Sequence, residues 1–199
     1  MRPLYVLDIE TTGLNGILMG DKVVEIGIAR VDLEQKKVFA EYGKVIRQEL
    51  TSDEKMSWVF THTDLDPTDV ERSPWTLDDV ILDLVTYNSG VFTSYNVVFD
   101  FDLFLNQPPF RFRPKMAPCI KCECGDRYNG GRWFSAQAAY DLLCSDNPAN
   151  VPDNKEEHRA LSDAVLEGHI LLRYLDDTPD AKRRYLDILN DDTRPWSYD

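Results

Sequence analysis

The most constraining feature of the sequence is a short apolar run near the N-terminus that ends in two carboxylates. Leu4 to Ile9 has the composition of a buried strand, and Asp8 and Glu10 lie two residues apart near its end. Because successive side chains of a strand point to opposite faces, both carboxylates are expected on one face. Two negative charges so close repel each other unless a cation lies between them, and such oxygen ligands suit Mg²⁺ or Mn²⁺. Taken alone, an acidic strand end that faces solvent is the commoner explanation.

Length and composition favour a single α/β domain. A chain of 199 residues, 43% of them hydrophobic, can bury one core, and no apolar run approaches membrane-spanning length. Nothing resembles a signal peptide, because the first expected strand begins within four residues of Met1. Four cysteines, three of them close together, fit free thiols or a metal site better than a disulfide framework. We therefore expect a cytoplasmic location, or another reducing compartment, and no membrane contact.

The net charge limits the kind of nucleic acid that the chain can bind. Its value is −13, whereas phosphate binding is driven by Lys and Arg. Bound divalent ions would neutralise an acidic centre, and a local basic patch can serve a short substrate. Tight binding of this chain alone to a long stretch of DNA is not expected.

Hydrophobic periodicity predicts three antiparallel strands followed by a largely helical region. Strands are expected at residues 4–9, 23–31, 37–46 and 91–95. Helices are expected at residues 52–60, 73–85, 96–105, 134–144 and 153–174. Residues 1–175 would form the domain, and 176–199 a C-terminal appendage with a small helical patch at 182–189.

Residues 107–133 form an expected irregular segment with a local excess of positive charge. Its basic, acidic and aromatic residues are Arg111, Arg113, Lys115, Lys121, Arg127 and Arg132; Glu123 and Asp126; and Phe110, Phe112, Tyr128 and Trp133. Basic and aromatic side chains together are what a single-stranded nucleic-acid surface needs. A surface loop anchored by its aromatic residues is the slightly favoured alternative.

The cysteines in this segment leave a second metal site open. Cys119, Cys122 and Cys124, with Cys144 later, have spacing that can wrap a structural zinc ion. Only one Cys-x-x-Cys pair is present, and Cys144 occupies an expected apolar helix position. Free thiols in a loop and in the core are therefore favoured over zinc.

Two later stretches complete the acidic pattern of the first. Asp100 follows the expected fourth strand, where a neighbouring central strand would bring it beside Asp8, although a helix-cap acid is the commoner reading. Asp163 lies within the apolar run of the last long helix, five residues after His158. A carboxylate among apolar residues needs a partner, and a metal ion shared with Asp8 would supply it.

The stretches DIETTGL, NVVFD and HRALSDA together resemble the three sequence blocks of the DEDDh (DnaQ-like) 3′-to-5′ exonuclease family. They occur in the family's order, and the match in outline covers residues 4–175. The family includes proofreading subunits of DNA polymerases, oligoribonuclease and RNase T. The resemblance implies a ribonuclease-H-like α/β fold, with a five-stranded mixed sheet flanked by helices, and residues 1–175 would be the exonuclease domain.

The resemblance also implies roles for particular residues. Two divalent cations, Mg²⁺ or Mn²⁺, would be held by Asp8, Glu10, Asp100 and Asp163. His158 would be the general base, because an imidazole has an ordinary pKa near neutral pH. Positions that match those lining the 3′-terminal nucleotide are Thr11, Thr12 and Leu14, and Asn96 is expected to help position the strand.

Three functions stay open at this point. The favoured one is hydrolysis of single-stranded or frayed 3′ ends to nucleoside 5′-monophosphates, with a proofreading or repair DNase slightly ahead. An RNA-trimming or oligoribonucleotide-degrading enzyme is the alternative within the same chemistry. A non-catalytic scaffold that docks to a polymerase, or to another replication or repair partner, is the alternative outside it. The oligomeric state is left unspecified.

Overall fold

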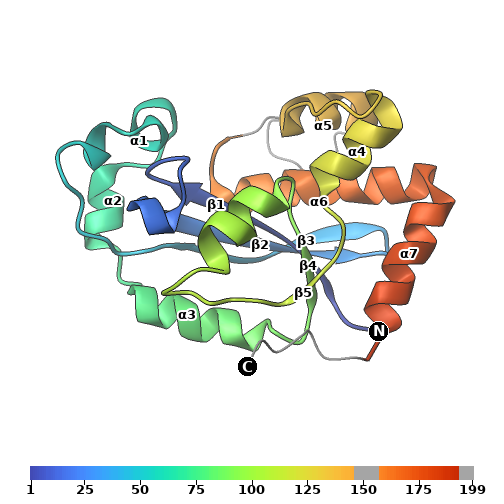
Figure 1. The fold of residues 1–199 in the computed structure, drawn as a ribbon, viewed down its shortest axis with the longest axis horizontal. Coiled ribbons are helices and arrows are strands. Elements are labelled where there is room, and N and C mark those ends of the chain that lie inside the picture. Colours follow the sequence, from blue (N-terminus) through green and yellow to red (C-terminus); the bar gives the residue numbers. More distant parts are fainter. Residues whose placement is uncertain (146–156, 193–199) are drawn as a thin grey trace.

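A mixed five-stranded sheet forms the centre of the computed structural model, which describes residues 1–145 and 157–192 (Figure 1). The strands are β1 (Leu4–Thr11), β2 (Val23–Asp32), β3 (Lys37–Val45), β4 (Val91–Thr93) and β5 (Lys115–Met116). Their order is β3-β2-β1-β4-β5, in which the first three strands are antiparallel and β1, β4 and β5 run parallel. The predicted α/β class and five-stranded mixed sheet are confirmed.

Helices cover both faces of this sheet. Those described are α1 (Trp58–His62), α2 (Pro67–Arg72), α3 (Leu77–Thr86), α4 (Ile120–Tyr128), α5 (Ala136–Cys144), α6 (Ala160–Asp177), α7 (Pro179–Asn190), the π-helix η3 (Val98–Leu105) and the 3₁₀ turns η1 (Ile17–Met19) and η2 (Glu54–Met56). Figure 1 shows α6 running along the sheet with α4 and α5 beside it and α3 on the other side. Among the described residues, no helix is long and apolar enough to cross a membrane.

Two hydrophobic cores lie on opposite faces of the sheet because the strand side chains alternate. Val6 of β1 packs in one core with residues of α5, α6 and α7, whereas Leu7 packs in the other with residues of α3 and η3. Helix α6 contacts β1, β2 and β3, so it is the main cover of the first face. The side chains of β1 that point to this face therefore lie against α6.

Several predicted helices begin at other residues in the structure. The helix expected at 73–85 starts at Leu77, because Thr76 and Asp79 form a reciprocal capping box. Ser73, the first residue of the expected range, donates from its hydroxyl to the Val45 carbonyl at 2.6 Å. The helix expected at 52–60 is divided into η2 and α1 by extended backbone at Ser57, and α2 was not predicted.

Helix α6 begins later than expected, and this changes the position of His158. A helix was expected from residue 153; residues 153–156 lie outside the described part of the chain, and α6 begins at Ala160. His158 has a φ of 53°, which is in the left-handed region and is incompatible with a right-handed helix. His158 therefore lies in a turn before the helix, whereas Asp163 is in the first turn of the helix itself.

The segment 107–133 is more ordered than the expected irregular loop. It contains β5 and α4, and its Phe110 and Phe112 side chains are buried in the core on the α3 side. Trp133 is exposed, with the Lys121 ammonium 4.6 Å from its ring centroid. The aromatic residues thus divide between anchoring the segment and facing solvent.

Helix α7, which follows residue 175, packs on the core on the α6 side of the sheet. Helix α7 matches the helical patch expected at 182–189 and buries Ala181, Tyr185 and Leu189. The Tyr185 hydroxyl donates to the Pro118 carbonyl at 2.8 Å. A boundary between a domain at 1–175 and an appendage at 176–199 stays a prediction.

Candidate active site

Asp8 and Glu10 lie on the face of β1 that α6 covers. They share the alternation of Val6, which packs against α6, and not that of Leu7. In the register of the sheet, Asp8 lies opposite Gly27 of β2. The strand therefore presents two carboxylates to the beginning of α6.

Glycine residues allow α6 to approach this part of the sheet closely. A Cβ atom on Gly27 would lie 2.2 Å from backbone atoms of Ala160, so only a glycine fits beneath the start of the helix. Gly43, which pairs with Gly27 in β3, would place a Cβ atom 2.9 Å from the Leu161 side chain. The first turn of α6 consequently rests directly on the strands, beside Asp8.

Glu10, His158 and Asp163 converge at this point. Each offers a ligand atom, and these atoms all lie within 4.8 Å of one another. Asp163 is buried, and its carboxylate accepts a hydrogen bond from the Glu157 backbone N–H at 3.0 Å. Within residues 1–145 and 157–192, this is the one such group of three or more His, Cys, Asp or Glu side chains.

The turn that carries His158 is held by an ion pair to β2. Arg159 donates from Nη2 and Nε to the two carboxylate oxygens of Glu25 at 2.8 and 3.0 Å. The backbone N–H of Ala160 donates to the same carboxylate at 3.2 Å. These contacts offset the cost of the left-handed backbone at His158 and fix the imidazole next to the acidic residues.

Asp8 lies in a strongly negative environment. Burial raises the pKa of its carboxyl well above the ordinary value, and the charges of Glu167, Asp100, Glu10 and Asp163 raise it further, in that order. All five carboxylates therefore act on one region of the structure. Glu167, on α6, was not among the predicted site residues.

Asp100 has a similarly perturbed carboxyl group. Burial raises its pKa to about 7, although the neighbouring Ser94 hydroxyl, the Lys121 charge and the Asn96 backbone favour ionisation. Asn96 thus reaches the site through its backbone, and its carbonyl also accepts the Asp100 N–H at 3.0 Å. Asp100 belongs to the π-helix η3, which is the next element after β4.

The donor set fits a divalent metal centre. Carboxylate oxygens match the ligands that Mg²⁺ and Mn²⁺ prefer. Bound cations would relieve the repulsion around Asp8 and would offset the burial that raises the pKa values of Asp8 and Asp100. Asp8, Glu10, Asp100 and Asp163 are the residues that would hold them. In the described part of the chain, no cysteine joins a converging group of this kind.

The four cysteines differ in burial, and Cys119 and Cys122 lie close enough to interact. Cys119 donates from its thiol to the Tyr95 carbonyl at 3.3 Å, and Cys122 is exposed. Cys124 and Cys144 are buried in the core on the α6 side, and burial raises the pKa of Cys124 to about 12. The thiols are free, and the buried ones have the environment of apolar core residues.

Asp8, Glu10, Asp100, His158 and Asp163 are together called the acidic cluster. An apolar hollow of about 400 Å³ adjoins it at Glu10. Its lining is Ile9, Glu10, Thr11, Thr12, Gly13, Leu14, Trp58, Val59 and Phe99. The Thr11 hydroxyl donates to the Gly13 carbonyl at 2.7 Å, and the Thr12 hydroxyl accepts the Lys22 N–H at 2.9 Å, so both fix the loop. Leu14 is 78% exposed at its edge. Thr11, Thr12 and Leu14, three of the four predicted substrate-binding positions, thus belong to its lining, and Asn96 does not. The lining residues Trp58 and Phe99 were not among the predicted positions.

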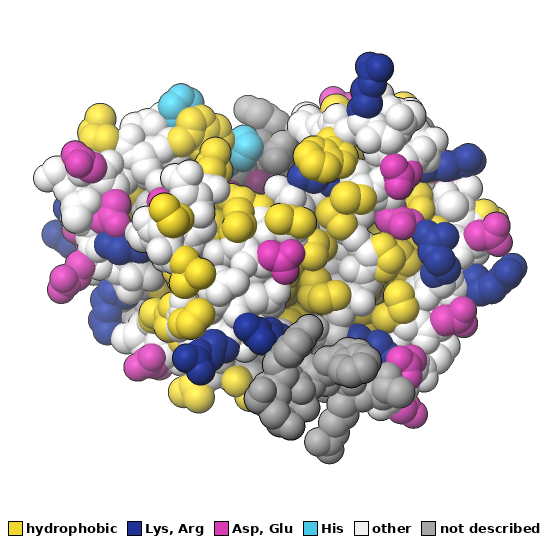
Figure 2. Space-filling view, in the orientation of Figure 1, with side chains coloured by type: hydrophobic (Ala, Val, Ile, Leu, Met, Phe, Trp, Pro, Cys, Tyr) yellow, Lys and Arg dark blue, Asp and Glu magenta, His cyan; other side chains and the backbone are white. Residues whose placement is uncertain are grey.

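Trp58 also lines a second hollow, of about 570 Å³, that contains His158. Its ring meets the His158 ring edge-on at 4.8 Å between centroids, and it stacks on His62 at 5.1 Å with planes 7° apart. His62 is the last residue of α1 and supports Trp58. Figure 2 shows hydrophobic and histidine side chains gathered around α1.

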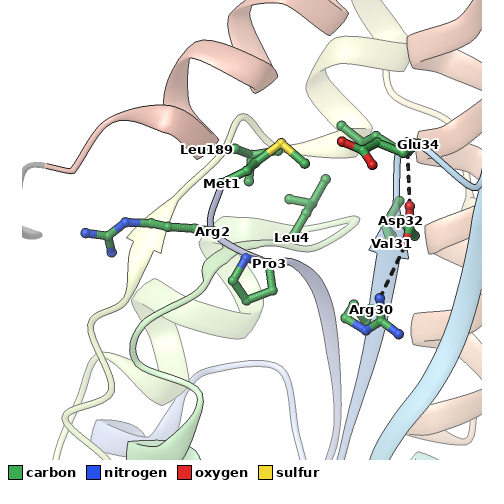
Figure 3. Close-up of a pocket in the computed structure, with 10 residues that line it drawn as sticks. Met1, Arg2, Pro3, Leu4, Arg30, Val31, Asp32, Glu34 and Leu189 are labelled. Carbon is green, nitrogen blue, oxygen red and sulfur yellow. Dashed lines mark hydrogen bonds and ion pairs between the residues drawn. The ribbon is translucent and has the colours of Figure 1, made fainter.

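A third hollow, of about 240 Å³, lies at the other end of β1, between the N-terminus and α7 (Figure 3). Among its charged residues, Arg30 lies 3.6 Å from Asp32 and bonds Glu41 at 2.5 Å. No converging group of metal-ligating side chains lies there among the described residues. The acidic cluster is therefore the candidate active site.

The fold of this chain is shared with nucleases of known structure. Exonuclease X in complex with 5′ overhanging duplex DNA aligns over 94% of this chain and 99% of its own, with 21% identity and a TM-score of 0.64. The nuclease domain of 3′hExo, a DEDDh family member bound to rAMP, aligns over 89% and 93%, with 15% identity and a TM-score of 0.62. The chain has the ribonuclease-H-like fold of these exonucleases.

A third similar structure is Escherichia coli Exonuclease I in complex with a dA16 oligonucleotide, at 14% identity and a TM-score of 0.67. The alignment covers 94% of this chain but 43% of that one, so the present fold corresponds to part of the larger nuclease. No protein-family model and no curated protein matches the chain. The likeness is therefore one of fold, and the site residues must carry the functional argument.

Proposed function

We propose that this protein is a divalent-metal-dependent 3′-to-5′ exonuclease. The observation that carries the proposal is the convergence of Glu10, His158 and Asp163 within 4.8 Å, beside half-buried Asp8 and buried Asp100. Two bound cations, Mg²⁺ or Mn²⁺, would lower the barrier at the terminal phosphodiester by polarising it and stabilising its developing charge.

The chain's own residues divide the remaining tasks. His158 is the general base that takes a proton from the attacking water, and the Arg159–Glu25 ion pair keeps its imidazole in place. The apolar hollow between Leu14 and Trp58 receives the terminal base of a 3′ end and excludes water from it. The products would be nucleoside 5′-monophosphates.

The substrate is proposed to be a short single-stranded or frayed 3′ end. The net charge of −13 disfavours a long duplex footprint and favours short substrates or substrates delivered by a polymerase or repair partner. We retain the slight preference for DNA and for a proofreading or repair role. Because all four cysteines are free, a reducing compartment such as the cytoplasm is part of the proposal.

Digestion of matched single-stranded DNA and RNA, labelled at either end, tests the proposal. With Mg²⁺ or Mn²⁺ we expect stepwise shortening from the 3′ end, and none with Asp163→Asn or with a chelator. His158→Ala should retain metal-dependent stabilisation while turnover falls about a hundredfold or more. No products from either sugar under any metal would favour the scaffold alternative, and preferential RNA cleavage would move the function to RNA trimming.

A further inference from the structure

Glu167 is a buried acid that the proposed catalytic chemistry does not use. It lies on α6 four residues after Asp163, so both side chains project from the same side of the helix toward β1. Glu167 is 4% exposed, and its neighbours Leu166, Gly168 and Ile170 are buried with it. A carboxylate in that position needs a function to offset the cost of its burial.

The contacts of Glu167 connect two segments that carry proposed metal ligands. Its Oε2 accepts the Tyr95 N–H at 3.0 Å, directly after β4. The Tyr95 carbonyl in turn accepts the N–H of Lys121 at 3.1 Å, so this junction also holds the start of α4. Since Asp100 follows on η3, Glu167 ties the helix that bears Asp163 to the segment that bears Asp100.

Glu167 also acts electrostatically on Asp8. Of the four neighbouring carboxylates, it has the largest effect on the pKa of Asp8, greater than those of Asp100, Glu10 and Asp163. A fifth negative charge destabilises the metal-free protein and strengthens the attraction for a divalent cation.

We propose that Glu167 is a positioning residue of the metal centre: its charge raises the affinity for divalent cations, and its hydrogen bond to Tyr95 aligns Asp100 with Asp163. This inference rests on the proposed function, because it requires a metal centre at Asp8. It assigns Glu167 no contact with the substrate.

Two substitutions separate the charge from the hydrogen bond. Glu167→Gln retains an oxygen that accepts from Tyr95 but removes the charge, whereas Glu167→Ala removes both. Asp177→Asn is the matched control, because it removes a negative charge from the exposed far end of the same helix. The whole chain is titrated with Mn²⁺, and the unfolding temperature is recorded at each concentration.

For Glu167→Gln we expect the half-saturating Mn²⁺ concentration to rise about tenfold and the metal-free unfolding temperature to exceed that of the wild type. Glu167→Ala should show a larger loss of affinity, because the alignment of Asp100 with Asp163 is lost as well, together with a lower metal-free unfolding temperature. Asp177→Asn should show neither change. A wild-type midpoint in Glu167→Gln would overturn the inference. So would lower turnover in both variants with an unchanged midpoint, which would mark a purely structural residue. If the wild type itself shows no Mn²⁺-dependent stabilisation, the proposed function fails with it, and the two failures are distinguished.

Discussion

Glu25 lies directly opposite Glu10 in the β1–β2 register, and Arg159 binds Glu25 through two hydrogen bonds of 2.8 and 3.0 Å. The neighbour of Arg159 in the chain is His158, which lies within 4.8 Å of Glu10. One strand pair therefore supplies a carboxylate for the proposed metal centre and a carboxylate that anchors the histidine turn. Glu10 can be held toward a cation because the charge of Glu25 is neutralised by Arg159.

This relationship predicts that the Glu25–Arg159 pair affects turnover more than metal binding. Arg159→Ala or Glu25→Gln should lower kcat about tenfold or more, because the His158 turn loses its anchor, while Mn²⁺-dependent stabilisation persists. The matched control is Glu41→Gln, which breaks a more exposed ion pair with Arg30 elsewhere on the sheet. Single-turnover cleavage and thermal titration give the two readouts. Equal loss of metal binding and turnover in Arg159→Ala would contradict the anchoring role.

Gly27 should be intolerant of any side chain. The Cβ atom of Gly27→Ala would meet the Ala160 backbone at 2.2 Å, so α6 must move away from the sheet at the site itself. We expect a loss of about 2–3 kcal/mol in the free energy of unfolding, together with weaker Mn²⁺ binding. Gly43→Ala, which meets only the flexible Leu161 side chain at 2.9 Å, should cost about 1 kcal/mol. Denaturant unfolding of both variants measures the difference; equal losses would show that the helix is not seated on Gly27.

Trp58 should contribute chiefly to substrate binding. Trp58→Ala removes a wall of the hollow beside Leu14 and should raise KM for an oligonucleotide about tenfold, since one stacked base is worth about 1–3 kcal/mol. Trp58→Phe should retain most of the affinity. Trp75→Ala is the control, because Trp75 is also partly exposed but lies against Lys44, outside the lining of this hollow. Steady-state kinetics decide the matter, and an unchanged KM in Trp58→Ala would exclude a base-stacking role.

The metal-free protein should become less stable as the pH rises. The pKa of Asp100 is raised from an ordinary 3.8 to about 7, so the folded protein keeps a proton that the unfolded chain releases at lower pH. The stabilisation linked to that proton is fully present below pH 3.8 and is lost as the pH rises through about 7. A shift of this size corresponds to about 4 kcal/mol.

Thermal unfolding in chelator between about pH 5 and pH 8 measures this dependence. Asp100→Asn should flatten it in part, and Asp8, whose pKa is also raised, should account for the remainder. With Mn²⁺ the trend should weaken or reverse, because protons compete with the metal for the carboxylates. An unfolding temperature that is constant with pH in chelator would contradict the prediction.

Sequence patterns were most informative where one element decides the outcome. The alternation of β1 placed Asp8 and Glu10 on one face before any partner was known, because that geometry is a property of the strand alone. The antiparallel start of the sheet followed in the same way from short turns between apolar runs. Start residues of helices were less predictable: Ser73 and Thr76 are both plausible caps, and the tertiary contact of Ser73 with Val45 decides between them.

Glu167 is an example of a residue whose burial beside the site could not be inferred from the sequence pattern. A signal was present, since it lies one helical turn after Asp163 in an apolar stretch, but the pattern alone cannot distinguish a buried acid from one at a solvent-facing position. The sequence pattern likewise cannot show that Trp58, His62, Phe99 and the Glu25–Arg159 pair lie beside the candidate site.

Local chemistry thus specifies the carboxylates, the histidine and the strand that presents two of the acids, because side-chain alternation and residue type are encoded over a few positions. Which distant side chains complete the site depends on how α6, α1 and η3 are rotated and seated on the sheet. That seating is set by contacts such as Gly27 with Ala160, between residues more than a hundred positions apart. Such contacts form only when the whole core packs, so they belong to the tertiary structure.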